Sequence, residues 1–397
     1  MTYKPPSAFL SLLIAGALLR LFFVFALPLY PEKTFLPGYN DEPLHLNYIR
    51  HIAEYNRLPI WYSEESETNP LVDEFGQAPL YYLIAVPFFW AGEALHTGWG
   101  LYGARLLSLC LGIIAAQFVY WSAQRIVRDE RIALAAMAAA LFAPNNVSFT
   151  SLVTNDAGLA CLCAMAFHSL LLVREGYGGV ARQIKTGVYL GLAAWMKVSA
   201  LALFPLGLIA IPFVHRRSNI ERGDAWMGRW RVLIVAVALV MPLIVWQSLH
   251  YGPGMLEINR YSPQATLGVS GGGVFHPLMA LKLMFRTAAA PFDQVWGSLV
   301  EKGMTSLWLL FAGTVSAIGL FQFLRSRERW MIHGAIGLTL FAFLLFNIRN
   351  FQVETRLFIP MLVPLAILAG SGCEKLRLPL AVQVIIWALP ILSLPYL

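Results

Sequence analysis

Charged side chains are scarce in this sequence. Only 13% of its 397 residues are Asp, Glu, Lys or Arg, and 58% are hydrophobic, whereas a soluble protein carries roughly 25% charged residues. The composition therefore excludes a soluble domain and predicts a polytopic membrane protein. The net charge of +7 does not indicate nucleic-acid binding, because no basic patch interleaved with aromatic residues occurs. An excess of Lys and Arg is typical of the cytoplasmic loops of membrane proteins.

The four cysteines offer neither a disulfide framework nor a zinc-binding spacing. They fall in or beside apolar segments, at Cys110, Cys161, Cys163 and Cys373. Two of them, Cys161 and Cys163, would point to different faces of a helix. We expect all four to serve as core packing.

Internal repeats, low-complexity linkers and a soluble domain are missing as well. The run Gly271–Gly273 lacks the strand and helix that flank a phosphate-binding loop, so it predicts only a flexible loop tip. We therefore expect an all-α protein with a single transmembrane domain over residues 1–397.

What the sequence does contain is a series of apolar stretches of the length that spans a bilayer, about 20 residues each. They lie at 7–30, 79–95, 101–124, 131–150, 156–174, 185–213, 231–249, 303–324, 331–347, 357–373 and 378–397. The first shows no clear cleavage site, so we expect it to be retained as a helix.

Clusters of basic residues give these spans an orientation, since such clusters are expected in the cytoplasm. Five of them occur, at 125–131, 174–185, 216–231, 325–329 and 375–377. All five can be cytoplasmic only if 79–95 does not cross the membrane, as its prolines and Glu93 favour. In addition, 185–213 must form a hairpin of two short spans with Lys197 at its outer turn. A lysine at the bilayer centre would be costly.

The resulting topology has about 11 transmembrane helices, estimated from the span length, with the N-terminus inside and the C-terminus outside. Two larger loops face outward. The first covers 31–100 and contains interfacial helices, and the second covers 250–302. This topology brings five charged residues to the same outer face: Asp41, Glu42, Asp156, Lys197 and Arg356.

The stretch 38–55 is the most polar part of the first outer loop. Asn40 is the expected helix N-cap, with Asp41 and Glu42 in the first turn, where the helix dipole favours negative charge. Apolar residues follow at helical spacing, at Leu44, Tyr48, Ile52 and Tyr55. They predict an amphipathic helix on the membrane surface, with Asp41 and His45 sharing another face. The simple alternative is a well-capped interfacial helix without chemistry.

Three more charged residues lie at the outer mouths of spans. Asp156 follows Asn155 at a helix start, Lys197 interrupts an apolar run, and Arg356 precedes another. Each has a purely structural alternative: a cap, a lysine that extends to the interface, and a surface ion pair. Glu74 and His276 are weak candidates for metal ligands, because isolated loop residues rarely bind a metal.

The order of these features resembles the GT-C membrane glycosyltransferases, in particular the branch of the protein O-mannosyltransferases and the lipid A aminoarabinose transferase. The similar segments are 40–42, 77–82, 104–108 leading to 123–125, 154–156, 191–197 and 355–360. The resemblance covers roughly residues 5–215 well and the C-terminal half loosely. Ala78 stands where this family usually has proline, and the soluble C-terminal domain of several relatives is absent.

This resemblance implies an inverting glycosyltransferase of the bacterial inner or plasma membrane. It would move a sugar from a polyprenyl-phosphate donor to a protein, lipid or glycan acceptor at the outer face. Asp41 would be the general base, with Asp156 orienting acceptor or sugar and Glu42 beside them in the catalytic set. Lys197 and Arg356 would stabilise the leaving phosphate.

Tyr82 and His45 complete the expected site as substrate-binding residues. Such a site does not demand a metal, and the residues leave open whether a divalent metal takes part. A proton-coupled transporter is the competing class, since intramembrane acids and a lysine also suit a carrier. Against it, the acids lie at one mouth and no inverted repeat occurs. An inactive scaffold of the same fold is a third alternative.

Overall fold

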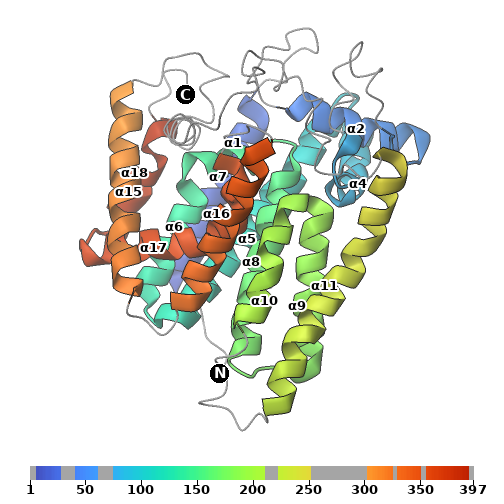
Figure 1. Ribbon diagram of the computed structural model, residues 1–397. Coiled ribbons are helices and arrows are strands. Elements are labelled where there is room, and N and C mark those ends of the chain that lie inside the picture. Colours follow the sequence, from blue (N-terminus) through green and yellow to red (C-terminus); the bar gives the residue numbers. More distant parts are fainter. Residues whose placement is uncertain are drawn as a thin grey trace.

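The protein is an all-α membrane protein. The computed structural model describes residues 6–27, 41–60, 75–210, 222–251, 302–324, 329–349 and 355–392, and no strand occurs among them. The helices are α1 (Ser7–Ala26), α2 (Glu42–Tyr55), α4 (Leu80–Leu95), α5 (Gly100–Val127), α6 (Glu130–Phe142), α7 (Pro144–Phe149), α8 (Asn155–Arg174), α9 (Gly179–Met196), η2 (Val198–Leu203), α10 (Phe204–Ala210), α11 (Arg222–Tyr251), α15 (Lys302–Phe323), α16 (Arg329–Arg349), η5 (Thr355–Met361), α17 (Leu362–Lys375) and α18 (Leu380–Leu392). Figure 1 shows them as a bundle of mostly upright helices.

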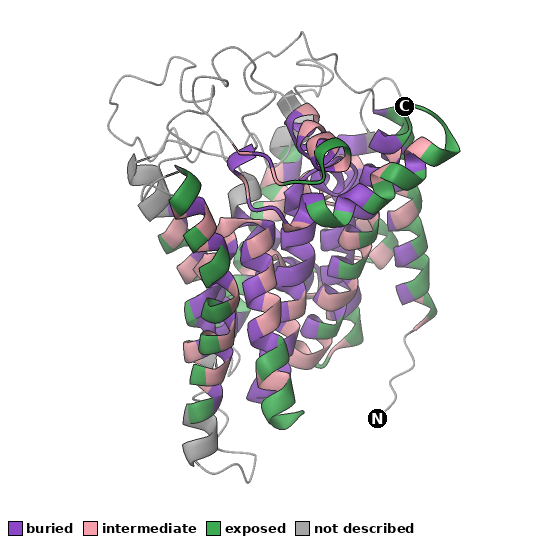
Figure 2. Ribbon diagram, turned by 90° about the vertical axis from the view of Figure 1, so that its right-hand side faces the viewer, coloured by how far each residue is buried: buried purple, intermediate pink, exposed green. Residues whose placement is uncertain are grey.

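Five helical segments in the described ranges are long and apolar enough to cross a membrane. They are α1, α5, α8, residues 227–250 of α11, and Phe358–Lys375. Large apolar side chains on the outside of the bundle, such as Leu18 and Ile234, are exposed by 60% each, and Figure 2 shows the exposed residues on its flanks. A surface of this kind suits lipid rather than water. The chain is therefore an integral membrane protein.

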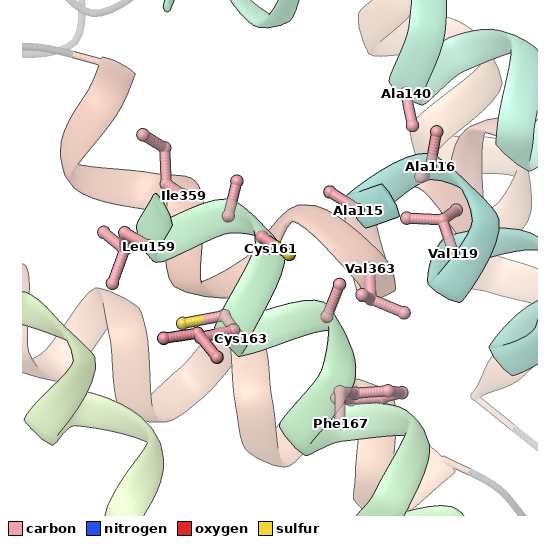
Figure 3. Packing of buried hydrophobic residues seen from close by; sticks show 14 of the residues in the cluster. Ala115, Ala116, Val119, Ala140, Leu159, Cys161, Cys163, Phe167, Ile359 and Val363 are labelled. Carbon is pink, nitrogen blue, oxygen red and sulfur yellow. The ribbon is translucent and has the colours of Figure 1, made fainter. Parts of the chain in front are cut away.

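Helix α8 forms the centre of the bundle, and almost all its residues are buried. It packs against α5, α9 and η5. Small side chains occur in these contacts, and Figure 3 shows Ala115 of α5 on the side that faces Cys161 of α8, whereas Ala116 points to Ala140 of α6. Such residues let helix backbones approach closely where lipid supplies no hydrophobic drive. All four cysteines are free thiols, and Cys161, Cys163 and Cys373 are buried in the core as expected. Cys110 is exposed, so the expected packing role is wrong for this residue.

The predicted break in 185–213 is confirmed. Helix α9 ends at Met196, and Lys197 adopts an extended conformation with φ −159° and ψ 133° before the short 3₁₀ helix η2 begins. A second break was not predicted: the span expected at 131–150 divides at Pro144 into α6 and α7. Proline lacks the amide hydrogen that a continuous helix would need there.

Two groups of charged residues lie at opposite ends of the bundle. At one end, Arg125 at the end of α5 pairs with Glu175 after α8, and Arg131 of α6 pairs with Glu374 of α17. The N-terminal end of α1 lies on this side, because Phe9 contacts the ring of Tyr120. At the opposite end lie α2 and α4 (Figure 1). This separation is the one that the predicted topology requires, and the cytoplasmic location of the basic end stays a prediction.

Helix α2 differs from expectation in two details. It begins at Glu42, and Asp41 is its N-cap rather than part of its first turn; Asn40 lies outside the described residues. Leu44, Tyr48 and Ile52 were expected to face the membrane surface, but they are buried within the protein, mostly against α4, and Tyr55 is 59% exposed. One face of α2 is therefore packed on protein, because α4 covers it.

Candidate active site

A buried ion pair anchors the start of α2. Nε and Nη2 of Arg105 donate to the two carboxylate oxygens of Glu42, at 2.7 and 2.6 Å. The remaining nitrogen of the guanidinium, Nη1, donates to the backbone carbonyls of Val24 at 2.7 Å and Leu27 at 2.8 Å. The backbone N–H of Val153 adds a third donor to Glu42, at 2.7 Å. These bonds join the end of α1, the start of α2, α5 and the segment before α8.

Glu42 was predicted as a member of the catalytic set, and its surroundings favour a structural role instead. Its side chain is buried and both oxygens accept hydrogen bonds from Arg105, so both are already occupied by donors of the protein. Arg105 was the partner that the sequence analysis missed. The signal was present, because an arginine inside an apolar span needs a buried partner.

Asp41, His45 and Tyr82 form a connected polar chain. Nε2 of His45 lies 3.5 Å from Oδ2 of Asp41, which is within the range of an ion pair, and Nδ1 of His45 lies 2.7 Å from the hydroxyl of Tyr82. If the hydroxyl donates to Nδ1, the ring proton lies on Nε2 and faces the carboxylate. Tyr48 stacks on Tyr82 with ring centroids 3.8 Å apart. The structure thus brings together the predicted base and both predicted substrate-binding residues.

Tyr81, the neighbour of Tyr82, ties this chain to the start of α8. Its hydroxyl lies 2.7 Å from Oγ of Ser108 in α5 and accepts from the backbone N–H of Thr154 at 3.2 Å. Thr154 is the N-cap of α8, and its side chain accepts from the N–H of Asp156. The predicted capped helix start is confirmed at this position.

Asp156 and Lys197 are paired. Nζ of Lys197 donates to Oδ1 of Asp156 at 2.6 Å, and the side chain of Asp156 is 1% exposed against 15% for that of Lys197. The pair forms because α8 and α9 are antiparallel neighbours, so the first turn of one meets the last turn of the other. Only Lys197 therefore reaches toward the surface, and Asp156 lies beneath it.

The remaining predicted residues are described only in part. The backbone of Arg356 lies in η5, which packs against α8 and η2, and its side chain lies outside the described part. Figure 3 shows Ile359 of η5 near Leu159 in the first turns of α8. Glu74 and His276 lie outside the described residues. Within the described ranges, no three His, Cys, Asp or Glu side chains form a group that could hold a metal ion.

Comparison with known proteins finds no matching family model and no matching curated protein. Solved structures do match. ArnT from Cupriavidus metallidurans bound to undecaprenyl phosphate is 18% identical, with a TM-score of 0.55 over 92% of this chain and 60% of that chain. The oligosaccharyltransferase of Archaeoglobus fulgidus in complex with zinc and sulfate is 14% identical, with a TM-score of 0.56 over 97% of this chain and 51% of that one.

A further structure of the archaeal oligosaccharyltransferase, AglB, contains an inhibitory peptide and a dolichol-phosphate. It is 15% identical, with a TM-score of 0.54 over 98% of this chain and 54% of that chain. Each of these proteins is a GT-C glycosyltransferase. The likeness confirms the GT-C fold that the sequence motifs predicted. The chain spans between half and three fifths of the length of the structures that it matches.

Proposed function

We propose that this protein is an inverting glycosyltransferase that moves a sugar from a polyprenyl-phosphate-linked donor to an acceptor at the outer membrane face. The main support is the arrangement of two buried carboxylates at one end of a GT-C bundle. Asp41 contacts a histidine, whereas Asp156 contacts a lysine. Two neighbours of the same fold carry undecaprenyl phosphate and dolichol-phosphate, which supports a lipid-linked donor for this chain.

Asp41 is the proposed general base. The acceptor hydroxyl or amine attacks the anomeric carbon from the face opposite the phosphate and transfers its proton to Asp41, so that the configuration inverts. The bond between the anomeric carbon and the phosphate oxygen breaks, and its electron pair leaves with the lipid phosphate. His45, itself held by Tyr82, orients the carboxylate.

Lys197 is the proposed phosphate-binding residue. An ammonium group has three N–H donors, so Lys197 can keep its bond to Asp156 and still donate to a phosphate oxygen. The charge that develops on the leaving group is then stabilised where it forms. Arg356 is proposed as the second cation, because η5 packs against η2, the segment that follows Lys197. These roles need no step through a metal.

The outer location of the site rests on charge. Arg125, Arg131 and the start of α1 lie at the opposite end of the bundle from Asp41 and Asp156. The positive-inside rule places that basic end in the cytoplasm. A polyprenyl donor would then be used on the far side of the membrane.

The test is single-turnover transfer from a radiolabelled polyprenyl-phosphate sugar by purified protein. Asp41→Asn keeps the shape and removes the basicity, so transfer should fall by about 10²–10⁴-fold while donor binding is retained. Glu54→Gln is the matched control, because Glu54 lies on the exposed side of the same helix. Near-normal transfer by Asp41→Asn would move the role of base to Asp156. No transfer by the wild type from a panel of donors to a panel of acceptors would favour the transporter instead.

A further inference from the structure

Gln247 is a polar residue in an otherwise apolar stretch of α11. Its side chain is turned inward and only 2% exposed. Nε2 donates to the backbone carbonyl of Gly76 at 3.1 Å. Because only the nitrogen of the amide can donate to a carbonyl, the other amide atom is the oxygen Oε1. Oε1 is buried and has no hydrogen-bond partner among the described residues. Polar residues at such positions are usually functional.

Asn155 repeats this pattern on the other side of the same short segment. It is fully buried, and its Nδ2 donates to Oε1 of Gln77 at 3.4 Å. Its Oδ1 is buried without a partner in the part of the chain that the structure describes. Tyr48 also reaches this segment, with its hydroxyl 3.4 Å from the carbonyl of Gln77. Three helices thus contribute polar groups around residues 76 and 77.

The two side-chain amides, of Gln247 and Asn155, have the same pattern of hydrogen bonds. Each uses its N–H₂ group within the protein and leaves its carbonyl oxygen, a hydrogen-bond acceptor, without a partner among the residues that the structure describes. A buried acceptor of this kind is destabilising and calls for an explanation. Two of them against adjacent residues call for a ligand that presents O–H or N–H donors. Asn155 directly precedes Asp156 in the first turn of α8, so one of the two acceptors lies one residue from the Asp156–Lys197 pair.

We infer that Oε1 of Gln247 and Oδ1 of Asn155 form a subsite that accepts hydrogen bonds from hydroxyl groups of the donor sugar. The inference rests on the proposed function and extends it to the recognition of the sugar. In a lipid-linked donor the sugar is attached directly to the phosphate. Lys197, the proposed phosphate-binding residue, donates to Asp156, which follows Asn155 in the chain. A site built on hydrogen bonds discriminates strongly against analogues that lack the hydroxyl.

The experiment compares two lipids that differ only in the sugar. Binding of undecaprenyl phosphate and of undecaprenyl-phosphate monosaccharides is measured for wild type and Gln247→Met, which keeps the side-chain length and removes the amide. We expect about three- to tenfold weaker binding of the sugar-linked lipid, the range for one lost neutral hydrogen bond, and unchanged binding of undecaprenyl phosphate. Lys197→Ala should weaken both lipids.

A matched control exists in the same chain. Gln383 is also 2% exposed, its Nε2 donates to the carbonyl of Leu378, and its Oε1 is equally without a described partner. It lies at the basic end of the bundle, one turn into α18 after α17. Gln383→Met should bind both lipids as the wild type does. Equal weakening of the sugar-linked lipid by both methionine variants would overturn the subsite.

Deoxy analogues of the tightest-binding sugar test the subsite without changing the protein. Removal of the hydroxyl that binds Gln247 should weaken binding to the wild type by the same factor as the Gln247→Met substitution. The same deoxy analogue should bind to Gln247→Met as tightly as the complete sugar-linked lipid does. If no deoxy analogue binds more weakly, or if Gln247→Met weakens both lipids equally, the acceptors only hold buried water and the inference fails while the proposed function stands. If the wild type binds neither lipid, both the proposed function and the proposed subsite are refuted.

Discussion

Substitution of Glu42 or Arg105 should destabilise the end of the bundle at which α2 lies rather than only slow a reaction. The two side chains are 2% and 0% exposed, and two hydrogen bonds of 2.7 and 2.6 Å join them. Arg105 also satisfies the carbonyls of Val24 and Leu27 where α1 ends. Removal of one partner leaves a buried charge without its counter-ion.

The expected loss is large for a single side chain. Breaking a buried pair from one side typically costs about 3–5 kcal/mol, whereas replacing both partners by apolar groups is often close to neutral. Glu42→Gln and Arg105→Met should therefore each lower the free energy of unfolding by about 3 kcal/mol. The double variant should lose much less than the sum, which a double-mutant cycle measures.

The assay is unfolding by SDS in mixed micelles, followed by tryptophan fluorescence. The control is the partly exposed pair Arg125–Glu175, whose side chains are 34% and 32% exposed; Glu175→Gln should cost less than about 1 kcal/mol. Wild-type stability of Glu42→Gln together with lost transfer would refute this reasoning and return Glu42 to the catalytic residues.

Three further predictions concern the site, the topology and the surface. Lys197→Ala should weaken binding of a polyprenyl phosphate, with part retained in Lys197→Arg because charge stays and geometry changes; unchanged affinity would make Lys197 a purely structural partner of Asp156. In a background without the native cysteines, a cysteine at position 128 should be labelled from the cytoplasm and one at position 54 from outside, and the reverse would invert the topology. Two backbone N–H groups lower the pKa of Glu93 at the end of α4, so its contribution to stability is present above its unfolded pKa of about 4.3 and is lost as the pH falls. Thermal melts should show Glu93→Gln less stable at pH 7 and equal to the wild type in acid, and an equal difference at both pH values would contradict this.

Much of the fold follows from the sequence because a membrane separates residues by polarity along one direction. Long apolar runs must be helices that satisfy their own backbone, and this reasoning located α1, α5, α8 and α11. A lysine inside an apolar run cannot remain at the bilayer centre, and the chain does break at Lys197. Pro144 likewise indicated a break in a helix. The apolar run 131–150 that contains it has the length of one span, however, and was interpreted as a single helix.

The sequence by itself predicted that Asp156 and Lys197 lie at the opposite end of the bundle from Arg125 and Arg131, because a helix advances about 1.5 Å per residue and these residues stand at opposite ends of their spans; the ion pairs in the structure agree. It did not determine how each helix is rotated or which helices are neighbours, because those depend on the packing of small residues such as Ala115 and Cys161 across several helices. The tertiary structure alone decided that Glu42 meets Arg105, that Asp156 meets Lys197, and that the amides of Asn155 and Gln247 surround one short segment. Partners of this kind come from different helices, and even those of the consecutive helices α8 and α9 lie about two helix lengths apart along the chain, so no local spacing could reveal them.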